Sequence, residues 1–291
     1  MKYFAVNTPA EALDEGARLI LGSGIQRDGY VISDEPVAFV HGRAERRVLM
    51  IDPFNVNPVD TFFDAIEFIT SDYVTQEVMQ QAVPFFQENG EEAYLECLDK
   101  QTPNNHVSIN IDKRGQLAML VSAQYGFAHE IHHQHIARYS YLQELLAAGI
   151  GVDTGKLYLT YGNYMFRGTL HNVNDAISLM RSRHYHCPYY TGSIQPSTLF
   201  GIEKKDVEAW QQQAKALLNN KTIMGNFSVF HRRTLSPMIT VRRLLTDTNK
   251  EEPARRMDAL RFLSMNASPN DWICAAINWL QDNQTKGEPN A

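Results

Sequence analysis

Apolar and polar positions alternate with a helical period near the start of the chain. Residues 8–21 place alanine and leucine side chains three and four positions apart, which is the spacing of one helix face. Thr8 and Pro9 stand in front of this stripe, and Glu11 follows in the expected first turn. A hydroxyl at the N-cap, a proline at the first helical position and an early acid are typical of a helix start. The pattern predicts an amphipathic helix.

Two stretches in the middle of the chain repeat the helical period. Residues 58–69 begin with Pro58 and carry closely spaced phenylalanines and isoleucines, which predicts a buried helix. Residues 136–148 show the same spacing of apolar side chains. Gly149 and Gly151 follow them, and we expect these glycines to end the helix.

Other runs of residues predict strands. Residues 107–111 alternate apolar side chains with serine and asparagine, and a Lys-Arg-Gly turn separates them from the apolar run 116–122. This arrangement predicts a hairpin with one buried face. β-branched and aromatic residues also gather in short runs at 30–33, 37–41, 47–51 and 157–161.

The remaining segments have helical character. Residues 70–103 are predicted to form one or two helices with a polar face, which end at a Gln-Thr-Pro turn. Beyond about residue 180, helical segments are separated by turns that contain proline. No repeat of fixed period and no linker rich in glycine and serine divides the chain.

Composition places the chain among ordinary globular proteins, with 44% hydrophobic and 21% charged residues. Its 27 Lys+Arg and 33 Asp+Glu give a net charge of −6, so nucleic-acid binding through overall charge is not expected. We see neither a signal peptide nor an apolar run long enough for a membrane helix. The three cysteines form no CxxC pair. We therefore expect a cytoplasmic protein without a membrane partner or a disulfide framework.

Four of the ten histidines fall within residues 129–135. His129, Glu130 and His133 have the spacing of an HExxH zinc site, in which two histidines one helical turn apart bind the metal. Gly126 and the adjacent histidines favour instead a turn or a wet surface near a ligand pocket, and we prefer this interpretation, so no metal ligand is assigned. A metal-dependent hydrolase that uses His129, Glu130 and His133 stays open as an alternative.

Arg27 lies in the loop 24–29, which glycines flank on both sides. A guanidinium on such a turn can hold a phosphate with two parallel N–H groups. The alternative interpretation is a plain turn with an exposed arginine.

The stretch RYSYLQELLAAGIGVDTGKLYLTYGNYMF (138–166) and Pro103-Asn104-Asn105 before the predicted hairpin resemble the thymidylate synthase family. The likeness is greater to its bacteriophage branch, which includes pyrimidine deoxynucleotide hydroxymethylases. The resemblance covers most of the chain except residues 70–102. The other segments that resemble this branch are GIQRDGYVIS near the N-terminus and residues 57–69, 226–238 and 267–280.

The resemblance implies a fold, a reaction and a partner. The implied fold is α+β, with a thymidylate-synthase-like mixed sheet covered by helices over residues 1–180 and a helical C-terminal extension, 181–291, packed on this core. Relatives attach a one-carbon unit to C5 of a pyrimidine nucleotide, with a cysteine thiolate as nucleophile and methylenetetrahydrofolate as cofactor. They bury a sheet face in a homodimer, which implies a homodimer or a heterodimer with a related chain.

Carried over residue by residue, the resemblance implies a degenerate site. Asn104 stands where the family has its cysteine, Asp64 stands where it has a glutamate, and His135 replaces the asparagine that reads the pyrimidine edge. Arg27 keeps the position of a phosphate-binding arginine, and the ribose-binding His and Tyr fall on Met165 and Arg167. The candidate catalytic residues are Asp64, Asn104 and His135, and the candidate nucleotide-binding residues are Arg27, Gln124, His135, Asn163 and Arg167.

The parental reaction, thymidylate synthesis or hydroxymethylation with another residue as nucleophile in place of Asn104, stays open at this point, and so do three other functions. The first is a divergent enzyme that binds a pyrimidine nucleotide and uses changed chemistry, with general acid or base work by His135 in place of covalent attack. The second is an inactive paralogue that acts as a dimer or heterodimer partner. The third is the metal-dependent hydrolase.

Overall fold

The chain combines a mixed sheet with helices. The computed structural model describes residues 1–49, 56–90, 93–98, 105–128, 131–184, 193–200, 206–221 and 228–284. Within these ranges it forms an eight-stranded sheet and nine α-helices. The predicted α+β class is therefore confirmed.

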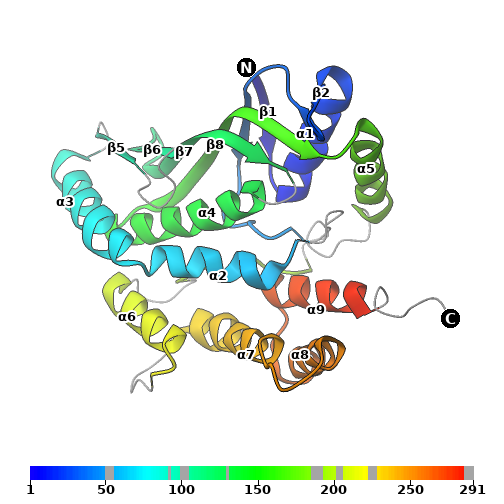
Figure 1. The fold of residues 1–291 in the computed structure, drawn as a ribbon. Helices are drawn as coiled ribbons and strands as arrows, with labels where there is room; N and C mark the ends of the chain where they lie inside the picture. The colour runs from blue at the N-terminus through cyan, green and yellow to red at the C-terminus, as the bar shows by residue number, and fades with distance from the viewer. Residues whose placement is uncertain are drawn as a thin grey trace.

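The strands pair in the order β1-β4-β8-β7-β6-β5, and a short hairpin of β2 and β3 attaches to β8 (Figure 1). The pairs β1–β4 and β7–β8 are parallel, and the other neighbouring pairs are antiparallel. The strands are β1 (Lys2–Val6), β2 (Ile25–Arg27), β3 (Tyr30–Ile32), β4 (Val37–His41), β5 (Tyr94–Leu98), β6 (Asn105–Ile111), β7 (Gln116–Phe127) and β8 (Asp153–Arg167).

The two faces of β8 differ in burial. Leu157 and Leu159 are fully buried, whereas Tyr158 and Thr160 beside them are partly exposed. The buried face lies against α4 (Ile131–Ile150), which contacts both β7 and β8 (Figure 1). α2 (Pro58–Ile69) packs on the other side of α4. α4 is therefore enclosed between the sheet and a second layer of helices.

The helix predicted over residues 8–21 is confirmed as α1 (Pro9–Ser23), which packs near the N-terminal strands of the sheet. Its N-cap is Thr8, whose side-chain oxygen accepts a hydrogen bond from the backbone N–H of Glu11 at 3.2 Å. Gly16 lies against Tyr164 of β8, and a Cβ atom there would stand 2.3 Å from the tyrosine ring. Only glycine permits so close an approach of helix and strand. α5 (Leu170–His184) packs on α1.

The helices predicted over residues 58–69 and 136–148 are also confirmed, although α4 begins earlier than expected. Gly151 has a φ of +94°, and the N–H of Val152 donates to the carbonyl of Ala147 at 3.0 Å. This left-handed turn ends α4 at the predicted glycine.

The predicted hairpin is confirmed as well. β6 and β7 run antiparallel, with Ile111 opposite Leu117. Gly115 occupies the turn with a φ of +71°, a conformation that glycine adopts without strain.

Two sequence predictions are wrong in part. Residues 47–49 of the expected strand 47–51 form no strand, because Arg47 is buried and pairs with Glu144 of α4 instead. Residues 73–89 are helical as predicted, as the π-helix η1 (Tyr73–Val78) and α3 (Met79–Asn89), but 94–98 form β5. This edge strand has five residues, and a sequence pattern of that length does not distinguish a strand from the end of a helix. Residues 50–51 and 99–103 lie outside the described residues.

The C-terminal helices form the layer beyond α2. Trp272 of α9 is fully buried, its ring meets Phe62 of α2 at 5.1 Å, and its Nε1 donates to Tyr141 Oη of α4 at 2.7 Å. α9 is thus packed on α2 and α4, and the division of the chain into a core and a C-terminal extension at residue 181 stays a prediction. The helices here are α6 (Val207–Leu218), the π-helix η3 (His231–Leu235), α7 (Ser236–Leu245), α8 (Glu252–Asn266) and α9 (Asp271–Gln284).

Across the described ranges, every helix falls short of the length and apolar character that a bilayer crossing needs.

The Trp272 contact gives a test of how α9 is held. Trp272→Phe should lower the free energy of unfolding by about 1–3 kcal/mol, because the buried Tyr141 hydroxyl loses its donor and a small void remains. Urea unfolding followed by circular dichroism measures this. Trp279→Phe is the matched control, because no side-chain partner of that indole N–H is present in the described residues. Equal losses in the two variants would contradict the assigned role of the hydrogen bond.

Candidate functional site

One end of the sheet gathers most of the residues that the sequence nominates. The start of β6 pairs with β7 at Asn105 and Ala123, and Ala123 in turn pairs with Tyr161 of β8. Further along the same two strands, Tyr125 pairs with Asn163. Asn104 comes directly before β6 but lies outside the described residues, so its predicted role is not placed.

The β2–β3 hairpin adds a row of three side chains at this end. Arg27 pairs with Tyr30, and Tyr30 pairs with Arg167, so the three side chains lie on one face of three neighbouring strands. Val31 and Phe166 alternate with them and are fully buried, so the row points away from the core. We call Arg27, Tyr30 and Arg167 the arginine row.

Both arginines of the row are accessible. The Arg27 side chain is 76% exposed, and its ion pair with the adjacent Asp28 spans 3.4 Å between two exposed groups. Such a pair contributes little and yields readily to a competing anion. Arg167 is exposed, and the Tyr30 ring is braced by Phe127 at 5.7 Å between ring centroids.

The loop of Arg27 proves to be a tight hairpin turn. Asp28 and Gly29 have φ values of +50° and +80°, the left-handed pair typical of a two-residue turn. The N–H of Gly168 donates to the Gly29 carbonyl at 2.8 Å and fastens the turn to the end of β8. Arg27 is thus held at a fixed place on the sheet edge.

His135 lies in a different environment, inside the core. It is 4% exposed, and it forms part of a buried polar group with Asn105, His132, Tyr139 and Tyr161, which we call the histidine–tyrosine cluster. Its ring stacks on Tyr161 at 5.8 Å with an angle of 8°.

A single assignment of hydrogens satisfies the contacts of this cluster. Asn105 Nδ2 lies 2.8 Å from Tyr139 Oη and 3.3 Å from His135 Nε2, and it donates to both. His135 Nδ1 then carries the proton and donates to Tyr161 Oη at 3.3 Å, and the tyrosine donates to His132 Nδ1 at 2.9 Å. His135 is neutral in this scheme.

Burial keeps these histidines uncharged. It lowers the pKa of His135 to about 3, with a smaller contribution from the nearby Arg138 guanidinium. Burial alone lowers the pKa of His41 on β4 to about 3, and it holds the pKa of His132 well below its usual value. In this arrangement His135 is a neutral hydrogen-bonding group, and it does not change its protonation state near neutral pH.

Asp64 lies next to the cluster, where an arginine holds it. Arg138 Nη2 and Nε reach the two Asp64 oxygens at 2.7 and 3.3 Å, a forked ion pair between α4 and α2. The guanidinium also lies over the Phe68 ring, at 4.9 Å from its centroid. The carboxylate is therefore held in one orientation, with both its oxygens engaged.

Four residues of this region were missed at the sequence level. Arg138 and Tyr139 follow His135 by three and four positions, so helical spacing alone places them on the same face of α4. Tyr30 and Tyr161 carry no such local signal, because strand register brings them to the site. Gln124, a predicted nucleotide contact, is exposed on β7, and Asn163 is partly exposed on β8.

The zinc alternative stays a prediction. His133 is 2% exposed in α4, while His129 and Glu130 lie outside the described residues. Among the residues that the structure does describe, no three His, Cys, Asp or Glu side chains are placed to hold a metal ion.

No protein-family model matches the chain, and no curated protein matches it either. The arginine row and the histidine–tyrosine cluster are therefore the features from which we infer a function.

The buried histidines predict a fall in stability at mildly acid pH. The unfolded chain protonates its histidines below about pH 6.5, whereas His41 and His135 stay neutral in the folded chain down to about pH 3. The contribution of each buried histidine to the free energy of unfolding is fully present above pH 6.5. It falls by about 1.4 kcal/mol for every pH unit below 6.5. Urea unfolding at pH 7, 6 and 5 measures the slope.

His41→Phe should reduce the pH dependence of the free energy of unfolding by the contribution of one buried histidine. The matched control is His171→Phe, because His171 is largely exposed on α5. A difference between wild type and His41→Phe that is the same at pH 7 and pH 5 would contradict the prediction.

Proposed function

We propose that the chain binds a pyrimidine nucleotide at the arginine row, as a divergent protein of the thymidylate synthase type. The observation that carries the proposal is the row itself, an aromatic ring between two exposed guanidinium groups on three neighbouring strands. Arg27 and Arg167 were nominated from the resemblance, and strand register supports their acting together. The likeness of the whole fold to this family is part of the proposal.

The chemistry of the row fits a phosphorylated heterocycle. The Arg27 and Arg167 backbones are two strand spacings apart, about 10 Å, which two extended guanidinium side chains can bridge around one phosphate. Charge-assisted, two-pronged hydrogen bonds to phosphate are strong and specific. The Tyr30 ring between them offers a stacking surface for a base. Such local cation pairing contrasts with the overall charge of −6.

The parental one-carbon reaction does not fit the residues present. Asn104 has no thiol, and the free cysteine Cys274 lies on α9, which packs on α2. His135 is neutral and buried, and Asp64 is engaged by Arg138. The donor set therefore lacks the nucleophile that methylenetetrahydrofolate chemistry needs, and we propose nucleotide binding without covalent attack on the ring.

Arg27→Ala and Arg167→Ala test the proposal by calorimetric titration with dUMP, dCMP and TMP. Each substitution should weaken nucleotide binding about tenfold, because a charge-assisted contact to phosphate is lost. Deoxyuridine, which has no phosphate, should bind weakly and equally to all variants. Arg261→Ala, which removes an exposed arginine on α8, should leave the affinity unchanged. Absence of any nucleotide binding at millimolar concentration would overturn the proposal.

A second candidate is an inactive paralogue that serves as a dimer partner. It is favoured by the sheet face that points away from α4, where Leu120 of β7 pairs with Ser108 and Tyr158. Leu120 is 37% exposed, and Tyr94 on the edge strand β5 is 55% exposed. Exposed apolar side chains on a broad sheet face are typical of a protein interface.

Sedimentation velocity at micromolar concentration tests this candidate. A dimer should form, and Leu120→Glu should convert it to monomer, because a charge would be buried at the interface. Leu170→Glu is the control, since Leu170 is equally exposed at the start of α5. A strict monomer in the wild type would exclude the dimer partner.

A further inference from the structure

A groove of about 600 Å³ opens at the end of α4 that lies opposite the arginine row. α6 forms one wall, and η1 with α3 forms the other. Gly149, at the last turn of α4, lies between them. This volume is in the range of small-molecule sites. π-helical turns such as η1 are frequent at such sites.

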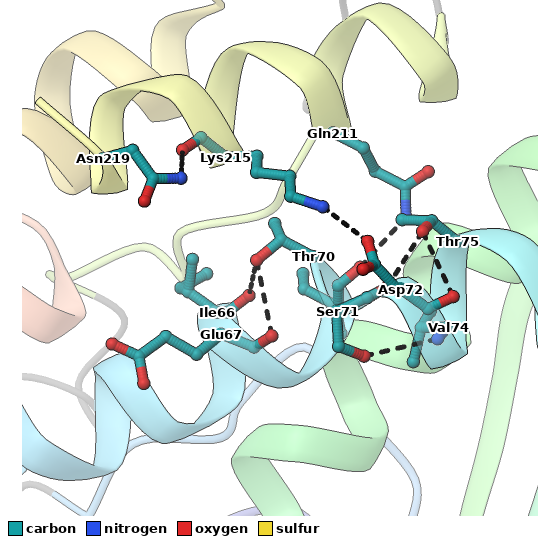
Figure 2. A network of polar contacts seen from close by, with 11 residues as sticks. Ile66, Glu67, Thr70, Ser71, Asp72, Val74, Thr75, Gln211, Lys215 and Asn219 are labelled. Atoms are coloured by element: carbon teal, nitrogen blue, oxygen red, sulfur yellow. Dashed lines mark hydrogen bonds and ion pairs between the residues drawn. The ribbon is translucent and has the colours of Figure 1, made fainter. Parts of the chain in front are cut away.

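The two walls are fastened to each other by polar contacts (Figure 2). Lys215 Nζ of α6 reaches Asp72 Oδ1, at the start of η1, at 2.5 Å. Gln211 Nε2 of α6 donates to the carbonyl of Ile69, at the end of α2, at 2.9 Å. The buried Gln211 contact holds α6 against the end of α2 before any ligand arrives, which reduces the cost of ordering on binding.

Apolar side chains make up much of the groove surface. Met79 and Val83 line it from α3, and Val207 lines it from α6. Gly149 lies close beneath, and a Cβ atom there would stand 2.9 Å from both Met79 Cε and Val83 Cγ2. The groove can therefore bury a compact apolar body.

One buried side chain of the groove leaves an acceptor open. Gln211 is 8% exposed, and its Nε2 donates to the Ile69 carbonyl, so its Oε1 is left as an acceptor without a partner among the described residues.

The unpaired charge of the groove is negative. Asp72 pairs with Lys215, the single lysine or arginine among the described lining residues. The Glu208 carboxylate, which accepts from Gln212 Nε2 at 3.1 Å, is left as the charge without a counterion in this lining. The carbonyl end of α4 also lies here, and its last turn holds no basic residue to offset the negative end of the helix dipole.

We propose that this groove binds a small organic cation, a protonated amine carried on a compact apolar body. The ammonium group donates to Glu208 and to Gln211 Oε1, and the apolar body lies on Met79 and Val83. An anion is disfavoured by the Glu208 carboxylate and by the carbonyl end of α4. The site is separate from the arginine row, so its ligand does not compete with a nucleotide.

Calorimetric titration of the full chain with three probes of one shape tests the proposal. Phenethylamine is cationic near neutral pH, 2-phenylethanol is neutral and phenylacetate is anionic. The cation should bind with saturation and at least tenfold more tightly than the neutral probe, and the anion should not bind. Equal binding of the three, or no saturable binding of the cation, would overturn the proposal.

Two variants locate the site. Glu208→Gln keeps the shape and removes the charge, and it should weaken phenethylamine binding about five- to tenfold. Glu251→Gln is the matched control, an exposed glutamate before α8, and should bind as the wild type does. Gln80→Trp places a large ring in the groove and should abolish binding.

Far-ultraviolet circular dichroism shows whether Gln80→Trp is folded. If that variant does not fold, the comparison of Glu208→Gln with Glu251→Gln decides the outcome. Unchanged binding in Glu208→Gln would place the ligand elsewhere and contradict the proposal. Loss of nucleotide binding in the arginine-row variants should leave phenethylamine binding unchanged, so the two proposals are tested independently.

Discussion

The enclosure of α4 between the sheet and the helices beyond it is the constraint on which the structure depends. Polar side chains on an enclosed helix are costly unless they find partners. Gln143 donates to the Leu117 carbonyl at 2.6 Å, and Glu144 pairs with Arg47 and accepts from the Leu199 N–H at 2.7 Å. Gln143 and Glu144 therefore attach the helix to different parts of the chain, from β7 to the segment before α6.

The same constraint shapes the nominated site. The N-terminal half of α4 carries His135 and Arg138, and the interior supplies partners for both, in Asn105 with Tyr161 and in Asp64. Groups that are satisfied in this way hold the fold together and are poorly suited to shuttle protons. The accessible polar groups lie instead towards the two ends of α4. The arginine row supplies cations at one end, and the groove supplies hydrogen-bond acceptors at the other.

Local patterns explain how much of the fold could be predicted from the sequence. Pro58 and Gly151 mark helix ends through backbone geometry, which acts over a few residues, and both ends are found where expected. β5 was missed because Tyr94–Leu98 depends on pairing with β6 for its conformation, and Arg47 was misplaced in a strand because its partner Glu144 is distant in sequence.

The candidate site was predictable only as a list of residues. Arg27 and Arg167 were nominated from the resemblance, but that they flank Tyr30 follows from strand register, which the sequence does not encode locally. His135 was expected to face a ligand, and its burial against Tyr161 comes from the packing of α4 on the sheet. Its predicted role in reading a base is still to be tested.

A crystal structure of the chain soaked with dUMP would show directly whether the arginine row binds a nucleotide. We expect a phosphate held between Arg27 and Arg167, with the base against Tyr30 and the histidine–tyrosine cluster unchanged. Nucleotide density at any other place, or none at saturating concentration, would contradict this expectation.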